Sequence, residues 1–332
     1  MGLRLDLPGL ARRTFIRAAA LGLLFASSAA LAAYPEKPVR LLVPFAAGGP
    51  TDQLARSFAQ RLSKELGQPV IAENRVGGNS VVAIQAVVQS GADGYTLVFA
   101  GQGPLVVSPQ LSSKIPYDIE KDLVPLGVVA NMPLVVLVNP SLPASTLQDF
   151  VRHAKANPGK LNYGSPGTGN PLHLAVELFN AGADIKMTHV PFNGTAPALT
   201  ALMGGELQTV FDVVSSAAPF VSSGRLKALA VTSTRRSALM PNVPTVAESG
   251  MPGYEASSWF ALAASSKAPA AVHQTLAAAT QKVMADAEFT SALEKTGLLP
   301  YPPMNAQQIQ GFLAEQKARW GDVIRKNNIR LD

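Results

Sequence analysis

Small polar residues and glycines gather in four short segments, at 44–52, 101–104, 164–170 and 192–195, and none of these contains Lys, Arg or His. We call them the first to fourth segments. Glycine-rich turns leave backbone N–H groups free to donate, and hydrogen bonds to a charged group contribute about 1.5–3 kcal/mol each. The segments therefore suit an anion held by backbone amides and neutral side chains. The expected side-chain donors are Ser165, Thr168, Asn170, Asn193 and Thr195.

A carboxylate fits these segments better than a phosphate, because they hold no Lys or Arg to balance a double charge. Asp52 and Asp212 would also repel a highly charged anion. If either aspartate faces the ligand, we expect it to accept a hydrogen bond from a ligand N–H or hydroxyl, or to orient its loop. For Asp212, the capping of a neighbouring turn at the end of a strand is an equal alternative.

Catalysis and metal binding receive little support from the residues. The chain has no cysteine, which excludes thiol nucleophiles, disulfides and thiolate metal sites. His173 and Glu177 lie four residues apart on an expected helix, but without a third ligand they are an ordinary polar pair. Ser165 lacks the Gly-x-Ser-x-Gly motif, and Leu172 stands where a dinucleotide fingerprint begun by 167–169 needs its third glycine. We therefore expect no enzyme, no cofactor and no metal.

Strands and helix starts position the four segments. Val39–Val43 is an apolar run that ends at the first segment, and Pro50 stands in the first turn of the helix that follows. This order directs free N–H groups and the positive end of a helix dipole beyond the strand, where an anion binds. The plain alternative is a tight connection in which Thr51 or Asp52 caps the helix. Three later segments of the same character favour binding.

The rest of the chain alternates strand and helix, which indicates α/β architecture with mostly parallel sheets flanked by helices. Further strands are expected at 69–73, 95–100, 124–139 (two apolar runs around 131–133), 186–191, 207–213, 225–232 and 257–264. Helices are expected at 51–66, 80–89, 147–156, 171–181 and 196–203, and over most of 269–326.

This order predicts two lobes, the first made of 34–132 plus 257–332 and the second of 133–256. Ligands of open α/β sheets bind beyond the carboxyl ends of the strands. The four segments should therefore line one cleft between the lobes. Trp259 and Phe260, on the returning strand, are expected to serve core or hinge packing.

Residues 1–33 read as a cleaved export signal. Arg12-Arg13 is followed by Phe15, then by an apolar run from Ala18 to Leu31 and a small-residue cleavage site. The arginine pair resembles a twin-arginine signal, and the general secretory route remains open. A membrane anchor is less favoured, because this run is short for a membrane span and contains two serines. We expect a periplasmic protein that is soluble after cleavage.

The charge balance argues against nucleic acid as a partner. The whole chain has a formal charge of +6, which falls to +3 when the four arginines and one aspartate of 1–33 are removed. No dense stripe of Lys and Arg remains.

Several short motifs run through the mature chain in order: 44–52 (PFAAGGPTD), 73–75 (ENR), 93–97 (DGYTL), 161–165 (LNYGS), 189–194 (HVPFNG), 211–212 (FD), 229–233 (LAVTS), 244–248 (PTVAE) and 252–255 (PGYE). In these motifs the chain resembles the substrate-binding proteins of tripartite tricarboxylate transporters, also called Bug receptors. The resemblance implies a monomeric periplasmic binding protein of the type II-like two-lobed fold. Such a receptor closes on a small carboxylated solute and delivers it to membrane permease subunits.

The resemblance also implies that the first and fourth segments hold a ligand carboxylate through main-chain groups and waters. Transferred by matching position, it points to Phe45, Ala46, Gly48, Gly49, Asp52, Ser165, Thr168, Asn193, Gly194, Thr195 and Asp212. Our full set of ligand-binding residues adds Thr51, Asn170 and Gln102. Gln102 is included because 101–104 departs from the family, which more often has Asn or Thr with Pro there. A second departure is that 76–79 is shorter than usual.

The solute stays open among dicarboxylates, tricarboxylates, aromatic acids, amino acids and nicotinate-like compounds. Two other functions also stay open. The protein would present its ligand to a membrane sensor in one, and act as a hydrolase or isomerase on the same frame in the other.

Overall fold

The structure, a computed structural model, describes residues 34–330 except 78–79. The predicted export signal lies outside the described residues. From Lys37 onward the chain forms one compact unit. Within the described residues, no helix combines the length and the apolar character that crossing a bilayer requires.

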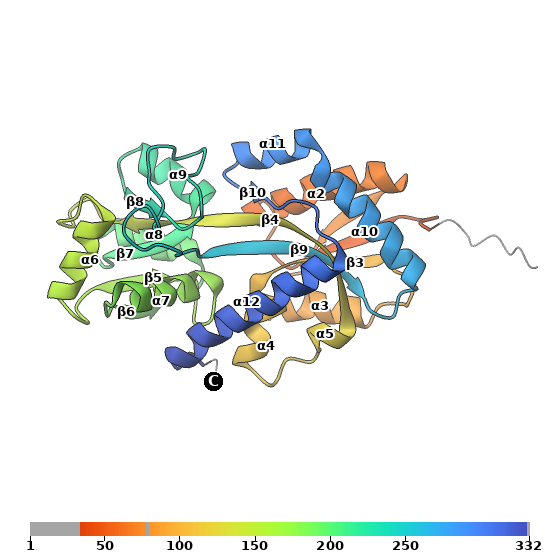
Figure 1. The fold of residues 1–332 in the computed structure, drawn as a ribbon, viewed down its shortest axis with the longest axis horizontal. Helices are drawn as coiled ribbons and strands as arrows, with labels where there is room; N and C mark the ends of the chain where they lie inside the picture. The colour runs from red at the N-terminus through yellow and green to blue at the C-terminus, as the bar shows by residue number, and fades with distance from the viewer. Residues whose placement is uncertain (1–33, 78–79, 331–332) are drawn as a thin grey trace, which may run out of the picture. The chain divides into compact units, whose positions relative to one another are not determined.

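The first half of this unit is built on a sheet with strand order β2-β1-β3-β9-β4 (Figure 1). Its first three strands are parallel, and β9 is antiparallel to both β3 and β4. The short β10 pairs with β4. The strands are β1 (Val39–Val43), β2 (Val70–Asn74), β3 (Thr96–Gly101), β4 (Leu123–Val138), β9 (Ser257–Ser265) and β10 (Leu299–Pro300).

In the second half the order continues from β4 through β7 and β5 to β6, and β8 also pairs with β4. β5 is parallel to β6 and β7, whereas β7 and β8 are antiparallel to β4. The α/β class is confirmed. The sheet is mixed rather than mostly parallel, because β4 and β9 run against their neighbours. The strands are β5 (Asn162–Ser165), β6 (Thr188–Pro191), β7 (Thr209–Val213) and β8 (Lys227–Val231).

The strand β4 joins the two halves. It is one strand of 16 residues, not two runs around a break, because its buried apolar residues continue through Pro133. It pairs with β9 up to Pro133 and with β7 and β8 from Leu134 onward. The division into two lobes stays a prediction, since contacts hold Lys37–Asp332 together as one unit.

Helices cover both faces of the sheet, with α2 and α10 on one side of β4 in Figure 1 and α12 on the other. The predicted helices are present within a few residues of their expected ends. α9 was not predicted, because its serines and Pro219 resemble a loop. The helices are α2 (Pro50–Leu66), α3 (Val81–Val88), the π-helix η2 (Gly103–Val107), α4 (Ser108–Leu111), α5 (Ile119–Asp122), α6 (Leu147–Ala156), α7 (Pro171–Ala183), α8 (Thr195–Met203), α9 (Val214–Ser222), α10 (Ala270–Ala285), α11 (Ala287–Lys295) and α12 (Ala306–Lys326).

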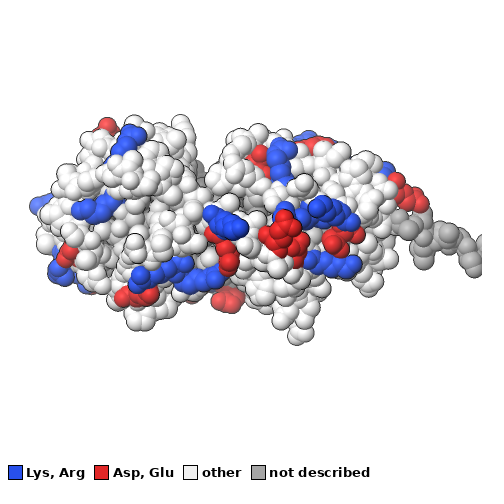
Figure 2. All heavy atoms as spheres, turned by 90° about the horizontal axis from the view of Figure 1, so that it is seen from above, with Lys and Arg blue, Asp and Glu red and all other residues white. Residues whose placement is uncertain are grey.

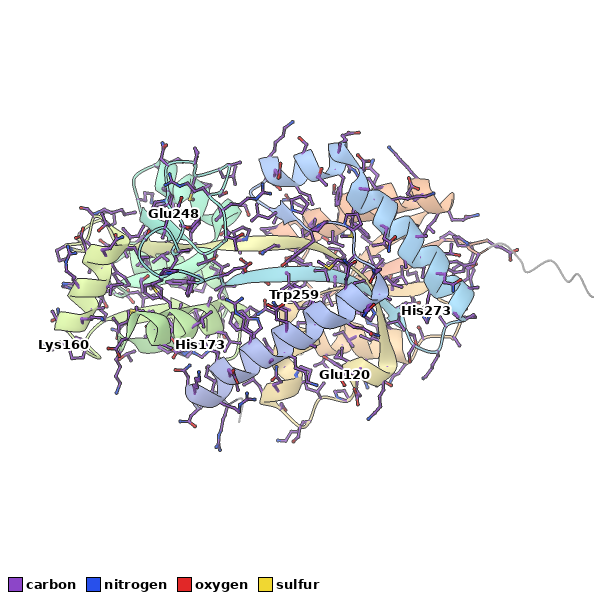
Figure 3. All side chains as sticks on the ribbon, viewed as in Figure 1. Glu120, Lys160, His173, Glu248, Trp259 and His273 are labelled. Atoms are coloured by element: carbon purple, nitrogen blue, oxygen red, sulfur yellow. The ribbon has the colours of Figure 1, made fainter. Side chains whose placement is uncertain are left out.

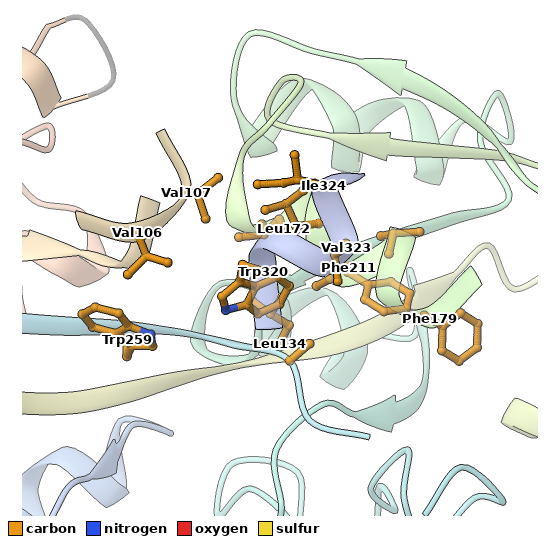
Figure 4. Packing of buried hydrophobic residues seen from close by; sticks show 14 of the residues in the cluster. Val106, Val107, Leu134, Leu172, Phe179, Phe211, Trp259, Trp320, Val323 and Ile324 are labelled. Carbon is orange, nitrogen blue, oxygen red and sulfur yellow. The ribbon is translucent and has the colours of Figure 1, made fainter. Parts of the chain in front are cut away.

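One buried apolar cluster extends from β1 to β7 and includes side chains of α12. Figure 4 shows Trp320 of α12 between the Val106 and Trp259 side of this cluster and its Phe179 side. The indole N–H groups of Trp259 and Trp320 both donate to Oε1 of Gln316 at 3.0 Å. Trp259 therefore serves core packing, as predicted.

Charged side chains are spread over the surface. Figure 2 shows Lys and Arg interleaved with Asp and Glu on the visible face, without a large area of one sign. Exposed ion pairs such as Arg235–Glu294 and Arg236–Glu248 account for part of this mixture.

Candidate functional site

Parts of all four segments border one cavity of about 560 Å³. This volume lies within the usual range for small-molecule sites. None of the lining residues that the structure describes is Lys, Arg, Asp or Glu. The lining from the four segments and the helix starts is Pro44, Phe45, Thr51, Gly101, Gly103, Pro104, Pro166, Gly167, Thr168, Gly169, Asn170, Pro171, Leu172 and Thr195.

Helix N-termini reach this cavity from both halves of the sheet. Thr51 of α2, Thr195 of α8 and Val213, which precedes α9, all line it. None of these three helices has a side chain capping its first amides. The first turn of a helix carries unpaired N–H groups and a partial positive charge. These helix starts therefore bring uncapped backbone amides to a cavity whose described lining has no cationic side chain.

A fourth helix, α7, also starts at the cavity, but its own sequence leaves its first amides capped or missing. Oδ1 of Asn170 accepts a hydrogen bond from the Leu172 N–H at 2.9 Å, and Pro171 has no N–H. Asn170 therefore caps α7 in addition to lining the cavity. The capping bond uses Oδ1 of Asn170, so the predicted donation to a ligand would come from its amide nitrogen.

The cavity also has an apolar wall. Phe45 and Phe260 meet edge to face with ring centroids 5.8 Å apart, and both line the cavity together with Met132 and Leu172. An amide-rich side beside an apolar wall matches the two ends of a small organic acid. Phe260 was predicted to serve packing only, and it is one of the site residues that the sequence did not reveal.

The first segment is braced by an ionic network. Asp52 is buried, and its carboxylate accepts hydrogen bonds from the Gly48 N–H at 2.9 Å, Asn74 Nδ2 at 2.7 Å and Arg56 Nε at 2.9 Å. Asn74 Nδ2 also donates to the Phe45 carbonyl at 3.0 Å. Burial opposes ionisation of Asp52, but these hydrogen bonds hold its pKa at about 2. Asp52 orients its loop and does not line the cavity.

The third segment is braced by neutral rings. Oγ of Ser165 lies 2.6 Å from Nε2 of His189, and the Gly169 N–H donates to Nδ1 of His173 at 3.1 Å. The two imidazoles are stacked with centroids 4.0 Å apart, and Tyr163 stacks on His189 at 4.9 Å. Burial lowers the pKa of His173 to about 3, with a further contribution from His189, and lowers that of His189 to about 4.

This arrangement differs from the predicted pair of His173 and Glu177. The Glu177 carboxylate instead accepts hydrogen bonds from the Tyr163 hydroxyl and from Asn180 Nδ2. His173 points to the backbone of the third segment and not to Glu177. Figure 3 shows where His173 lies at α7. The described residues contain no group of three His, Asp or Glu suited to a metal ion.

Ser165 and His189 have the spacing of a nucleophile and its base, which the sequence did not predict because 24 residues separate them. Ser165 is fully buried, so a substrate cannot reach its hydroxyl. Among the hydrogen bonds of the described residues, none joins His189 to a carboxylate that would orient it. The pair is suited to hold the loop rather than to attack a substrate.

Asp212 lies at the end of β7, next to the cavity but outside its lining. It is 1% exposed, and its Oδ2 accepts a hydrogen bond from Ser216 Oγ at 2.7 Å. Burial raises its pKa to about 6 in spite of this hydrogen bond and one from the Val213 N–H. Asp212 thus holds the Ser216 side chain in the first turn of α9, whose amides have no side-chain cap, so the capping alternative stays a prediction.

Gln102 does not reach the cavity. β3 extends to Gly101 and the chain enters η2 at once, so the second segment is a strand-to-helix junction and not an open loop. The Gln102 side chain is fully buried. With its amide assigned from the surrounding hydrogen-bond partners, it donates to the Ser257 carbonyl at 2.7 Å and shares the Trp320 indole N–H, 2.9 Å away, with Gln316. Its role is to join the second segment to β9 and α12.

Of the predicted site residues, the structure brings five into the cavity lining: Phe45, Thr51, Thr168, Asn170 and Thr195. Ser165 and Asp52 brace the loops from behind. Ala46, Gly48, Gly49, Asn193 and Gly194 belong to the same turns without lining the cavity. Contact of any of these residues with a ligand stays a prediction.

Several lining residues were not predicted, and they come from the two connecting strands and from α3 and α4. Met132, Ser258 and Phe260 lie on β4 and β9, while Ser80 and Ser108 stand at helix starts. The sequence signal that could have revealed the last two is a serine at the start of a helix. We find no sequence signal for Met132, Ser258 and Phe260, because each lies in a strand whose pattern is that of buried core positions.

The fold defines the class of protein. The chain superimposes on the Rpa4515 protein of R. palustris solved with adipate, with a TM-score of 0.79 and 32% identity over 90% of this chain and 99% of that one. It also superimposes on MatC of Rhodopseudomonas palustris with bound malate, with a TM-score of 0.74 and 30% identity over 88% and 100% of the two chains. The architecture is that of the periplasmic binding proteins.

Sequence relationships narrow this class to one family. Residues 54–329 match the family described as the tripartite tricarboxylate transporter family receptor. Protein BugT of Bordetella pertussis is 34% identical over 299 residues, which are 90% of this chain and 91% of BugT. The chain therefore belongs to the tripartite tricarboxylate transporter receptor family, as its motifs predict.

Proposed function

We propose that this protein captures a small organic carboxylate in the cavity between its two sheet halves and delivers it to the membrane subunits of a tripartite transporter. The observation that carries the proposal is the convergence of three uncapped helix N-termini on a cavity whose described lining has no charged side chain. Backbone amides there stabilise a carboxylate without a counter-charge. The transporter as recipient rests on family membership.

The chemistry of the cavity favours an acid with a short hydrocarbon part. One side offers amides, hydroxyls and helix dipoles, and the other offers Phe45, Phe260 and Met132. Two family structures with adipate and malate support a dicarboxylate as the first class to test. Three or four hydrogen bonds to the carboxylates contribute about 4.5–12 kcal/mol before ordering costs, compared with the roughly 8 kcal/mol net that micromolar affinity needs.

We further propose that the halves on either side of Pro133 and Ser257 are lobes that close on the ligand. Only β4 and β9 among the described strands extend from one half towards the other, so bending of these two strands is the motion with the fewest broken hydrogen bonds. Binding without chemical turnover fits the burial of Ser165. The family and the predicted signal at 1–33 both support a periplasmic location.

A substitution at Gly49 tests the anion site directly. Gly49 is the N-cap of α2 with φ −72 and ψ 167, and a Cβ there meets only the Ala46 carbonyl at 3.6 Å. Gly49→Asp therefore fits without strain, caps the helix and places a negative charge at the helix start. We expect it to raise the free energy of unfolding by about 1 kcal/mol. The same variant should weaken adipate or malate binding by about a hundredfold or more, measured by calorimetry.

Gly49→Ala is the matched control, because it adds the same Cβ without a cap or a charge. It should bind within about threefold of the unaltered protein. A screen of dicarboxylates, aromatic acids and amino acids by thermal shift precedes the comparison, since a ligand at 100 times its Kd stabilises a fold by about 2.7 kcal/mol. Equal binding by the aspartate and alanine variants, or conversion of the ligand by the purified protein, would refute the proposal.

A further inference from the structure

Two histidines of the second half, the buried His173 and the partly buried His189, brace the third segment from outside the cavity. His173 comes from the first turn of α7 and His189 from β6, and neither lines the cavity. Each is hydrogen-bonded to a different end of the 165–170 stretch: His189 to Ser165 Oγ at its start, and His173 to the Gly169 N–H near its end. The rings lie face to face with centroids 4.0 Å apart.

The stretch between these two anchors forms part of the cavity wall. Gly167, Thr168, Gly169 and Asn170 all line the cavity. Gly167 and Gly169 have positive φ angles of 131° and 74°, conformations that glycine adopts without strain but also leaves without cost. Backbone hydrogen bonds from the Asn170 N–H to the Gly167 carbonyl at 3.2 Å and from the Phe192 N–H to the Ser165 carbonyl at 2.9 Å close this turn, and the two histidine anchors add order at its ends.

The geometry requires neutral imidazoles. Nδ1 of His173 accepts a hydrogen bond from a backbone N–H, so it must be unprotonated there. Two stacked imidazolium rings at this distance would also repel each other. Burial and the neighbouring ring lower the pKa values of both histidines, in agreement with this requirement.

No carboxylate of the described residues is hydrogen-bonded to either histidine. The elements β5, β6, β7, α7 and α8 carry five titratable groups within their bounds: Tyr163, His173, Glu177, His189 and Asp212. The helix α12, which also packs on α7, carries charged residues of both signs, namely Glu315, Lys317, Arg319, Asp322, Arg325 and Lys326. Glu177 accepts from the Tyr163 hydroxyl, and Asp212 accepts from Ser216. Neither carboxylate is hydrogen-bonded to a histidine.

We propose that His173 and His189 are positioning residues, a stacked imidazole pair that fixes both ends of the 165–170 stretch so that its backbone faces the ligand carboxylate. This proposal rests on the carboxylate-binding function proposed above. In it the histidines act through the loop and never contact the ligand. Their ring nitrogens are the essential atoms, and their stacking keeps the two anchors in register.

The hydrogen bond from Gly169 to His173 can be observed directly in the unaltered protein. In uniformly 15N-labelled protein we expect a scalar coupling through the hydrogen bond between the Gly169 amide nitrogen and Nδ1 of His173. The Nδ1 shift should be that of an unprotonated ring at neutral pH. Absence of the coupling together with a protonated Nδ1 would overturn the proposal. This measurement needs no ligand and no variant.

Variants test the position of each nitrogen. Asparagine places a polar atom where Nδ1 of histidine stands and glutamine places one where Nε2 stands. His173→Asn and His189→Gln should therefore bind adipate or malate, whichever binds the unaltered protein more tightly, within about threefold. The mismatched His173→Gln and His189→Asn should bind at least about tenfold more weakly, which corresponds to about 1.4 kcal/mol. Calorimetry gives the Kd values and circular dichroism checks the fold.

This reciprocal pattern separates positioning from mere packing, because both substitutes for each histidine are amides without the ring. Equal binding by all four variants, or weakening that follows side-chain size in both positions, would overturn the proposal. If the unaltered protein binds neither acid nor any member of the wider screen, the proposed function fails, while the scalar coupling still decides how the loop is held.

Discussion

The first and third segments face one cavity but are held by opposite kinds of chemistry. The first is fixed by a buried carboxylate, an arginine and an asparagine, all connected to Asp52. The third is fixed by two neutral imidazoles and a serine. An ionic brace keeps its charge over the whole physiological pH range, because the pKa of Asp52 is about 2 and arginine stays protonated. A neutral imidazole brace is stable only while protons stay off it.

The comparison shows that a cavity without charged lining residues can have charged residues behind its wall. Charge is allowed behind the first segment because Asp52 is screened by its own partners. The Arg56 side chain is 49% exposed and directed to Asp52 and Asn74, so it does not enter the cavity. The third segment is instead supported by uncharged rings, the buried His173 and the partly buried His189.

The largest expected difference between the two braces is their response to acid. Free imidazoles bind protons below their ordinary pKa of 6.5, whereas the folded ones do so only near 3 for His173 and 4 for His189. Stability is therefore complete above about pH 6.5 and is lost as the pH falls. Each ring contributes a slope of up to about 1.4 kcal/mol per pH unit. Urea denaturation should show a loss of about 4 kcal/mol between about pH 7 and about pH 5 from the two rings together.

The control is the double variant His173→Asn with His189→Gln, which replaces both titrating rings and keeps the polar atoms. Its stability should fall less over the same range, and the difference between the two proteins isolates the histidines from all other groups. Parallel pH profiles for the two proteins would show that the imidazoles are not buried in the neutral form.

The second prediction breaks the ionic brace. Asp52→Ala leaves the Gly48 N–H and Asn74 Nδ2 without their acceptor, and we expect a loss of about 3 kcal/mol in the free energy of unfolding. Affinity for the carboxylate should fall as well, because the first segment loses its orientation. Arg56→Ala should cost only about 1 kcal/mol, since its side chain is half exposed. If a change from about pH 7 to about pH 5 affected Asp52→Ala less than the unaltered protein, the distinction between the braces would be wrong, because Asp52 keeps its charge over that range.

The third prediction concerns Asp212, which belongs to neither brace. Its raised pKa of about 6 means that the folded state favours the protonated form, so its contribution to stability is present at low pH and is lost as the pH rises through 6. Asp212→Asn keeps an acceptor for Ser216 and should stabilise the protein by roughly 2 kcal/mol near pH 8, with no gain below about pH 4. Chemical denaturation at the two pH values measures the change. A loss of stability at the higher pH would contradict the prediction, because it would mean that the folded protein favours the ionised carboxylate.

The sequence by itself determined the strands, most helices and the four glycine-rich segments, because hydrophobic periodicity and turn residues act locally. It also predicted that an anion would be held without Lys or Arg, since the segments contain none. Thr168, Asn170 and Thr195 followed from the same argument, and Phe45 from the resemblance to the family. Family membership could be inferred because the motifs recur in order along the whole chain.

Tertiary structure decided what stands behind the loops. Asn74 braces Asp52 across 22 residues, and His189 meets Ser165 across 24, separations that no local pattern encodes. Gln102, which was predicted to bind the ligand, is buried against Ser257 and Trp320. Phe260, which was predicted to serve packing, lines the cavity. The physical reason is that residue type determines whether a side chain favours burial or hydrogen bonding. The direction in which each strand ends determines which other residues it contacts.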